Sequence, residues 1–430
     1  MRHRCFTIAL LLVCQTAWFL LFLPTPLAVF YDNVRYEEAG WRLANGQGLS
    51  LPYALMPDPE VRSWACDRDG AACPDDGSYP TALYPPLYQG FIAVLYLAFD
   101  RSLTVVFFAH WVLLIVALCC YESLLFRVVQ KTGYIFGVVV AAGYPFVAHI
   151  AAQIRADHLH LTLVAACVLV PFLALNPWQK AGCFGLLLSL ATLARPYTVL
   201  AVPVLMLFPP VVRVYAPTIR TWCVAICVFT LPFVLWSGRN ADVFGRFIPL
   251  TVGGLGTSLY LNVCEAELGS SVIAANAIEC RRRIAAFGPE PLVRSVNQAL
   301  EREAVSWIRA HPWQVAALLP RRAPRLWISL GYNRKGLSAG WPLLVVGLGG
   351  LLALACVGGW VVRRDPRYRP LLVLVVGYWL FLLHTPAEAR RTLPLRLPAL
   401  VLAATAVDAA VRRRQGEPIP YVTGIPLSTT

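Results

Sequence analysis

The chain has 430 residues, of which 58% are hydrophobic and 14% are charged. Soluble domains carry about 25% charged residues, so the composition excludes an ordinary soluble protein and indicates a polytopic membrane protein. The formal net charge of +14 can indicate a nucleic-acid partner, but the basic residues lie in short clusters between apolar runs. The chain has no zinc-finger spacing, RNA-binding signature or long basic tail. We therefore predict no nucleic-acid partner and interpret the charge as a topology signal.

The first predicted membrane helix covers the apolar run 5–30, which follows Arg2 and Arg4. At about 1.5 Å per residue, this run is long enough to cross a hydrocarbon core ~30 Å thick. Basic flanks favour the cytoplasmic side, so the helix should run outward and place Asp32 at its outer end. A cleaved signal peptide is the alternative, although the run is long for one.

An acid-rich outer segment, 31–80, comes next, and we expect the short apolar run 83–99 to form a helix docked at the outer face. Further crossings are expected over 103–126, 134–152, 159–175, 181–194, 197–212, 221–236, 341–362, 371–384 and 393–411. In this topology the basic clusters at 127–131, 213–220, 363–364 and 412–414 all lie inside, as the positive-inside rule requires. The sequence therefore predicts an all-α protein with about ten transmembrane helices and two large outer loops that carry juxtamembrane helices.

Three regions follow from this topology. They are a membrane module over 1–237 that includes the outer loop 31–100, an outer loop over 238–340, and C-terminal membrane helices with a short cytoplasmic tail over 341–430. The run 313–327 mixes basic and apolar residues and is predicted to be an amphipathic surface helix. The alternative is that it crosses the membrane, which would invert the last spans.

Four of the 13 cysteines lie in the two outer segments and are spaced as pairs, Cys66 with Cys73 and Cys264 with Cys280. The other cysteines lie in or beside apolar runs, where a thiol behaves as a small hydrophobic group. Paired loop cysteines are typical of an oxidising compartment. We therefore predict two disulfides on the outer side.

Charged residues recur at the outer ends of the predicted helices: Asp32, Arg155 with Asp157, Arg195, and Glu388 with Arg390. An ionisable side chain costs ~2.5–3.5 kcal/mol at the centre of a membrane helix and less at the rim. Such residues are therefore candidate functional groups, although an arginine at a helix end can also extend to the interface without a function.

Acids and arginines at one membrane face suit sugar transfer from a lipid-linked phosphate. Arginine binds phosphate through a planar fork of donors, and a carboxylate can deprotonate an attacking hydroxyl. The glycine-rich stretch 253–256 follows no predicted strand and lacks the lysine of a P-loop, so a nucleotide donor is not expected.

The order of several short motifs resembles the GT-C superfamily of polytopic glycosyltransferases, and within it the bacterial branch of protein O-mannosyltransferases and lipid A aminoarabinose transferase. The stretch 31–48 is similar to that family's first outer loop, with an acid, then Tyr and Ala, then Gly-x-Gly. Later motifs of the family are resembled by the stretches 84–88, 155–159, 194–196, 238–240, 244–247 and 390–394. The match covers most of the chain.

The resemblance implies a GT-C fold and inverting transfer from a polyprenyl-phosphate sugar on the outer face. It makes Asp32 the general base, and Asp157 the residue that orients the base, the acceptor or a metal ion. The candidate donor-phosphate ligands are Arg155, Arg195, Arg239 and Arg390, and the candidates for acceptor or metal binding are His158, His160 and Glu388. Two departures are Asn33, where many relatives have Glu, and Arg391, where an aromatic residue is expected.

The expected partners are the lipid-linked sugar, an acceptor that is a lipid, a glycan or a protein, and the bilayer. No cofactor is firmly predicted, and a divalent metal ion is the one candidate. The expected location is the bacterial inner membrane, with the active site facing the periplasm. The alternatives are a lipid or glycan transporter or flippase without transferase activity, which would usually contain internal repeats, and a structural assembly subunit.

Overall fold

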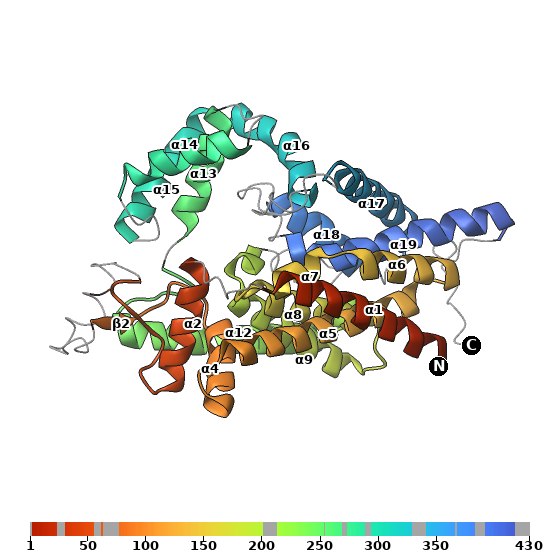
Figure 1. Cartoon of the computed structure of the whole chain (residues 1–430), viewed down its shortest axis with the longest axis horizontal. Helices are drawn as coiled ribbons and strands as arrows, with labels where there is room; N and C mark the ends of the chain where they lie inside the picture. The colour runs from red at the N-terminus through yellow and green to blue at the C-terminus, as the bar shows by residue number, and fades with distance from the viewer. Residues whose placement is uncertain are drawn as a thin grey trace.

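The computed structural model describes residues 2–23, 31–55, 62, 77–200, 213–252, 254–268, 273–288, 294–328, 341–365, 368–382 and 392–417. A bundle of apolar helices forms the main body of this part of the chain (Figure 1). Its helices are α1 (Arg2–Phe22), α5 (Leu103–Val128), α6 (Lys131–Gly143), α7 (Phe146–Ala151), α8 (Asp157–Leu169), α9 (Pro177–Ala194), α12 (Ile219–Phe244), α17 (Trp341–Val362), α18 (Arg369–Leu382) and α19 (Leu393–Gln415). One continuous hydrophobic core runs through the bundle.

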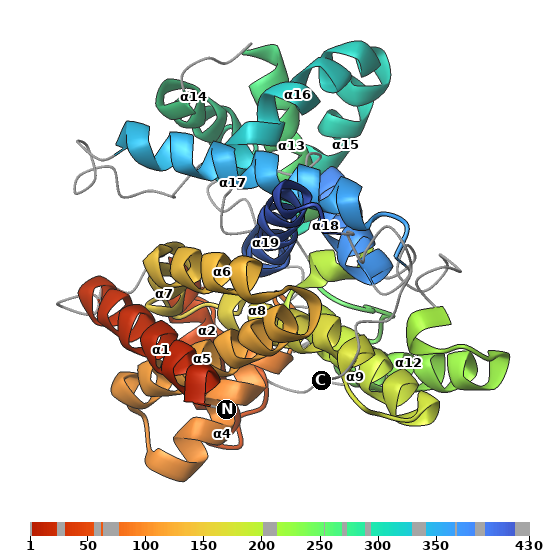
Figure 2. The same ribbon diagram turned by 90° about the vertical axis from the view of Figure 1, so that its right-hand side faces the viewer.

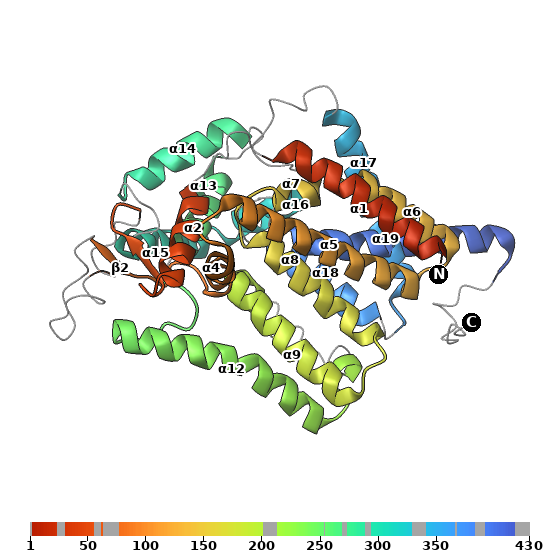
Figure 3. The same ribbon diagram turned by 60° about the horizontal axis from the view of Figure 1, so that its bottom comes forward.

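One end of the bundle carries two short helices, of which the first is polar and the second is apolar. α2 (Tyr31–Ala44) packs on α4 (Leu87–Phe99), and β1 (Ser50–Pro52) pairs antiparallel with β2 (Ser78–Pro80). The start of α1 and the end of α19 both lie at the opposite end (Figures 1 and 3). Both ends of the described chain therefore lie on the side away from α2, as the predicted topology requires.

A separate lobe contains α13 (Leu255–Glu267), α14 (Ile273–Ala285), α15 (Arg294–Ala310) and α16 (Pro312–Ile328). Figure 2 shows this lobe apart from α1, α5 and α9, with α17 to α19 between them. The lobe has its own small core, which contains the disulfide between Cys264 and Cys280. One of the two predicted disulfides is therefore present; Cys66 and Cys73 lie outside the described residues.

Large apolar side chains on the outer surface of the bundle indicate contact with lipid. Phe6 and Leu21 on α1, Phe108 on α5, and Leu231 and Leu235 on α12 are all mostly exposed. By length and hydropathy, α1, α5, α12 and α19 are each able to cross a membrane, and α4, α6, α8 and α17 contain shorter apolar helices. An outer surface this apolar is typical of a membrane protein.

Close contacts between helices depend on glycine at several places, two of them within the bundle of apolar helices. A Cβ at Gly358 of α17 would lie 1.7 Å from the carbonyl oxygen of Leu402 on α19, and one at Gly185 of α9 would lie 2.3 Å from that of Ala225 on α12. Small residues allow helix backbones to approach closely inside membranes. Any larger residue at these positions would separate the helices.

The all-helical membrane class predicted from the sequence is confirmed, but two predicted spans have other boundaries. The run 5–30 is not one helix, because α1 ends at Phe22 and α2 begins at Tyr31. The run 134–152 is divided between α6 and α7, because Pro145 cannot continue a helix from the residue before it. The predicted span 197–212 has only its first residues described, as part of the short 3-10 helix η3 (Pro196–Leu200). The total of about ten crossings stays a prediction.

Candidate functional site

Tyr36 of α2 is the centre of an aromatic cluster at the end of the bundle that carries α2. Its ring stacks on Tyr84 with the centroids 4.3 Å apart, and Tyr88 meets it edge-on at 5.1 Å. Burial raises the pKa of the Tyr36 phenol and of the Tyr84 phenol. Both hydroxyls therefore stay protonated at neutral pH; that of Tyr84 donates a hydrogen bond, and that of Tyr36 accepts one.

Asp32 lies one helical turn before Tyr36, on the same face of α2. The Tyr84 hydroxyl donates a hydrogen bond to Asp32 Oδ1 at 3.0 Å. Asp32 is in the first turn of α2, where the helix dipole favours a negative charge, and its side chain is partly exposed. The prediction that it ends the first membrane helix is wrong: it begins a separate helix, and the prolines at 24 and 26 disfavour a continuous one.

Asp157 and Arg195 form an ion pair at the ends of two neighbouring helices. Asp157 is the first residue of α8, and Arg195 is the C-cap of α9. The guanidinium Nη2 of Arg195 donates to Asp157 Oδ2, and its Nη1 donates to the Tyr36 hydroxyl at 3.3 Å. The side chain of Asp157 is only 3% exposed and that of Arg195 15%. The pair therefore links α8 and α9 to α2 through a buried carboxylate and a mostly buried guanidinium.

Arg155 lies on the turn between α7 and α8, two residues before Asp157. Its side chain is partly buried, and its Nε is buried without a hydrogen-bond partner among the described residues. The charges of Arg195, Asp32, Asp157 and Arg155 all act on the pKa of the Tyr36 phenol. Four of the residues selected from the sequence therefore influence one buried hydroxyl electrostatically, and Arg195 also donates a hydrogen bond to it.

The predicted histidines lie inside the bundle. His160 Nε2 is 2.7 Å from Thr198 Oγ1, and the His158 ring lies 5.9 Å from the ring of His110. Within the described part of the chain, no group of three or more His, Cys, Asp or Glu side chains is placed to hold a metal ion. The divalent ion remains a prediction.

Arg239 of α12 lies against the two-stranded hairpin. Its guanidinium donates to the backbone oxygens of Thr81 and Leu49, each at 3.2 Å, and to Asn240 Oδ1 at 3.0 Å. It also lies near the rings of Trp236 and Phe244 on its own helix. These contacts give Arg239 a structural role that joins α12 to the hairpin, apart from any role with phosphate. Two other candidates, Glu388 and Arg390, lie outside the described residues.

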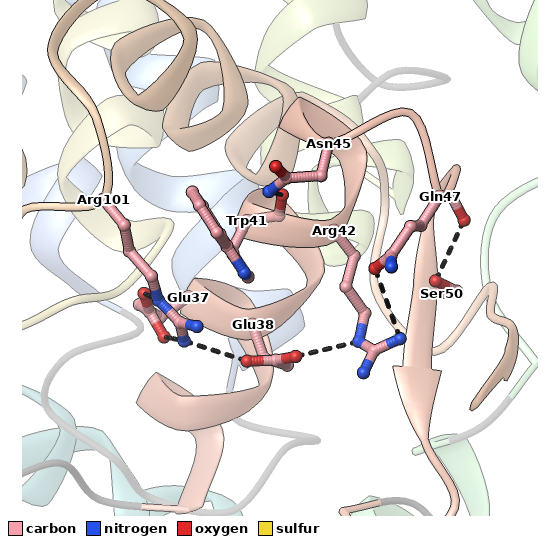
Figure 4. A network of polar contacts seen from close by, with 8 residues as sticks. All are labelled: Glu37, Glu38, Trp41, Arg42, Asn45, Gln47, Ser50 and Arg101. Carbon is pink, nitrogen blue, oxygen red and sulfur yellow. Dashed lines mark hydrogen bonds and ion pairs between the residues drawn. The ribbon is translucent and has the colours of Figure 1, made fainter. Parts of the chain in front are cut away.

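A second charged network holds α2 in place (Figure 4). Glu37, which is buried, receives two hydrogen bonds from Arg101, at 2.8 and 2.6 Å, and one from the Tyr96 hydroxyl at 2.9 Å. Glu38 pairs with both Arg101 and Arg42. These two acids of α2 are therefore structural partners that fix α2 against α4.

The sequence motifs do not single out the tyrosines at the centre of the site. Tyr84 and Tyr88 belong to the stretch 84–88 that resembles a family motif, but the resemblance gives them no role. The four-residue spacing between Asp32 and Tyr36 would have placed both on one face if 31–44 had been interpreted as a helix. That signal was present in the sequence.

Solved structures provide the comparison with known proteins. The chain is similar to the archaeal oligosaccharyltransferase AglB from Archaeoglobus fulgidus in complex with an inhibitory peptide and a dolichol-phosphate, with a TM-score of 0.51 and 14% identity over 99% of this chain and 52% of that one. It is also similar to the Archaeoglobus fulgidus oligosaccharyltransferase tethered to an acceptor peptide containing the NVT sequon, with a TM-score of 0.50 and 15% identity over 95% and 50% of the two chains.

The chain spans about half the length of these two oligosaccharyltransferases. ArnT from Cupriavidus metallidurans in the apo state matches at 13% identity over 92% of this chain and 78% of that one, but its TM-score of 0.35 is too low to carry an argument. No protein-family model matches the chain, and no curated protein matches it in sequence. The GT-C fold expected from the motifs is therefore confirmed as a fold, and the branch within it stays a prediction.

Proposed function

We propose that the protein is a membrane glycosyltransferase that moves a sugar from a polyprenyl-phosphate donor to an acceptor hydroxyl on the outer face of the membrane. The observation that carries this proposal is a connected polar cluster, in which Arg195 donates to both Asp157 and the Tyr36 hydroxyl, and Tyr84, stacked on Tyr36, donates to Asp32. The shared fold supports it, since one of the similar oligosaccharyltransferases was solved with a dolichol-phosphate and an inhibitory peptide. The proposed location is the bacterial inner membrane, with this site facing the periplasm.

Asp32 is the proposed general base. The acceptor oxygen attacks the anomeric carbon, the bond from that carbon to the phosphate oxygen breaks, and the acceptor proton passes to the Asp32 carboxylate. Direct displacement of this kind inverts the anomeric centre. Asp32 is partly exposed, whereas Asp157 is buried against Arg195, so Asp32 is the acid that an acceptor can reach more easily.

Asp157 and Arg195 are proposed to orient the site. Their ion pair and the bond from Arg195 to Tyr36 connect the ends of α8 and α9 to the helix that carries Asp32. Asp157 already holds the guanidinium of Arg195. We therefore assign Arg195 primarily to orienting the site, and only secondarily to binding the donor phosphate. Acceptor contacts by His158, His160 and Glu388 remain secondary proposals.

Arg155 is the proposed ligand of the donor phosphate, together with Arg390. Arg155 lies on the turn before α8, two residues from Asp157, and its buried Nε has no partner among the described residues. A leaving phosphate gains negative charge as the sugar bond breaks, and a nearby guanidinium stabilises that charge. Replacing Arg155 with Lys keeps the positive charge but removes the planar fork, so the apparent KM for the donor should rise while acceptor dependence stays nearly unchanged.

The experiment that tests this function incubates the purified protein in lipid with a polyprenyl-phosphate sugar and cell-envelope acceptors. The measured quantities are the release of polyprenyl phosphate and the transfer of labelled sugar to an acceptor. Glu303→Gln, a substitution of an exposed acid on α15, is the matched control and should behave as wild type. Movement of intact donor across the bilayer without its consumption would support a flippase and contradict the proposal.

A further inference from the structure

His110 is a fully buried polar side chain near the start of α5, and none of the proposed catalytic steps uses it. Its imidazole lies between two elements that carry the site. Nε2 is 2.8 Å from the hydroxyl of Tyr88 at the start of α4, and Nδ1 is 3.0 Å from the carbonyl oxygen of Ala151, the last residue of α7. One side chain therefore bridges three helices.

The two contacts determine which nitrogen carries the proton in neutral His110. A carbonyl oxygen can only accept a hydrogen bond, so Nδ1 must be the N–H that donates to Ala151. Nε2 then has a free lone pair and accepts the hydrogen bond from the Tyr88 hydroxyl. The arrangement requires one donor and one acceptor on opposite sides of the same ring.

Each end of this bridge leads to a different half of the site. Tyr88 packs edge-on against Tyr36 and lies four residues after Tyr84, whose hydroxyl donates to Asp32. On the other side, Ala151 ends α7 immediately before the turn that carries Arg155 and leads into α8 at Asp157. We call the part of the site around Asp32 the acid half and the part around Arg155 the arginine half. His110 therefore contacts the acid half through Nε2 and the arginine half through Nδ1.

We propose that His110 is a positioning residue that sets the placement of Asp32 relative to Arg155. This inference rests on the proposed function, because it assigns the acid half to proton removal and the arginine half to donor binding. His110 touches neither the donor nor the acceptor in this scheme. It acts through Tyr88 on one side and through the Ala151 carbonyl on the other.

Two substitutions of His110 by an amide side chain each remove one of its two hydrogen bonds and keep the other, so they test the two halves of the site separately. In His110→Asn the amide N–H takes the place of Nδ1 and can still donate to Ala151, while the acceptor for Tyr88 is lost. In His110→Gln the amide oxygen takes the place of Nε2 and can still accept from Tyr88, while the donor to Ala151 is lost. A residue that only fills space would respond to both substitutions in the same way.

The expected result is a split between kcat and the KM for the donor. His110→Asn should lower kcat roughly tenfold with little change in the KM for the polyprenyl-phosphate sugar, because the tyrosines next to Asp32 shift. His110→Gln should raise that KM roughly tenfold with little change in kcat, because the turn of Arg155 shifts. A tenfold change corresponds to about 1.4 kcal/mol, the upper part of the range for one intramolecular hydrogen bond.

Tyr121→Phe is the matched control, because it removes another buried hydrogen bond of α5, the one from the Tyr121 hydroxyl to the Gly137 carbonyl at 3.2 Å. It should lower the Tm in detergent without changing either kinetic constant. Tyr88→Phe should reproduce the kcat loss of His110→Asn, and the double variant should lose no more than either single variant. Equal effects of Asn and Gln, or effects on Tm alone, would overturn the inference.

Failure of the proposed function is distinguishable from failure of this inference. If the wild-type protein transfers no sugar, the function is wrong, and the bridge is then tested by Tm in the cycle of His110→Asn and Tyr88→Phe. Additive losses of Tm in that cycle mean that the two side chains are not coupled, which overturns the bridge. If the wild type is active and the cycle is non-additive, the kinetic split decides the positioning role.

Discussion

Charged residues are arranged in opposite ways at the end of the bundle around Tyr36 and in the lobe of α13 to α16. Around Tyr36, the side chains of Asp157 and Arg195 are 3% and 15% exposed, and they connect separate helices. In the lobe, Arg283 and Glu267 are 36% and 40% exposed, and the lobe is closed by the Cys264–Cys280 disulfide. An exposed ion pair contributes little to stability, whereas breaking a buried one leaves an uncompensated charge. The site therefore depends on its charges, and the lobe depends on its small core and its covalent bond.

The variant with the largest expected effect tests whether the end of the bundle around Tyr36 is a catalytic site. Asp32→Asn keeps the size of the side chain and can still accept from Tyr84, but it cannot take a proton. Loss of a general base typically lowers the rate by about 10²–10⁴-fold, so turnover should nearly vanish while donor binding persists. Rates of sugar transfer and binding of the polyprenyl-phosphate sugar are the measurements. Near-wild-type turnover would place the base elsewhere.

The next effect concerns the stability of the same end. Arg195→Leu removes the partner of buried Asp157 and should lower the free energy of unfolding by about 3–5 kcal/mol. Thermal unfolding in detergent measures the loss. Combining it with Asp157→Asn, which removes the unpaired charge, should recover part of the stability. If the double variant is no more stable than Arg195→Leu, the ion pair is not the cause.

The third prediction concerns the stability of the lobe of α13 to α16. Replacing Cys264 and Cys280 with Ser should destabilise the lobe by roughly 3 kcal/mol, because the chain-entropy model gives about that value for a loop of this length. Hydrogen exchange of α13 and α14 should accelerate, while the bundle around Tyr36 keeps its protection. Equal loss of protection in both regions would show that the lobe and the bundle unfold as one unit.

A smaller effect compares two neighbouring acids on α2. Glu37→Gln removes the charge that receives three hydrogen bonds in a buried position, so it should cost about 1.5–3 kcal/mol of stability. Glu38→Gln, whose side chain is 16% exposed, should cost less. Thermal unfolding of the two variants side by side provides the measurement. A larger loss for Glu38 would reverse the assignment of Glu37 as the main contact of Arg101.

The smallest effect is expected for the exposed ion pairs of the lobe, which we compare with the Asp157–Arg195 pair. Arg283→Ala removes exposed ion pairs to Glu267 and Glu279 in the lobe, and its effect on thermal stability should be within experimental error at physiological salt. Raising the salt concentration should change the wild-type lobe equally little. A loss similar to that of Arg195→Leu would mean that exposure does not explain the difference between the two regions.

Much of the architecture could be predicted from the sequence because membrane helices can be recognised by the length and composition of their apolar runs. Apolar runs predicted α5, α17 and α19 close to their observed bounds, since only a helix satisfies its own backbone groups in lipid, whereas α12 continues to Phe244, beyond the predicted end at 236. The Cys264–Cys280 bond followed from an even pair of cysteines in one outer segment. The lengths of α1 and α6 were wrong, because prolines within and after the apolar runs end helices that hydropathy alone would continue.

For the site, the sequence by itself determined which charged residues are unusual: Asp32, Arg155, Asp157 and Arg195 are ionisable side chains next to long apolar runs. Only the tertiary structure decided which of them meet. Arg195 is held by Asp157 and Tyr36, whereas Arg239, an equally plausible candidate, lies against the hairpin. The physical reason is that spacing along one helix fixes which residues share a face, but contacts between α2, α8 and α9 depend on how distant helices pack.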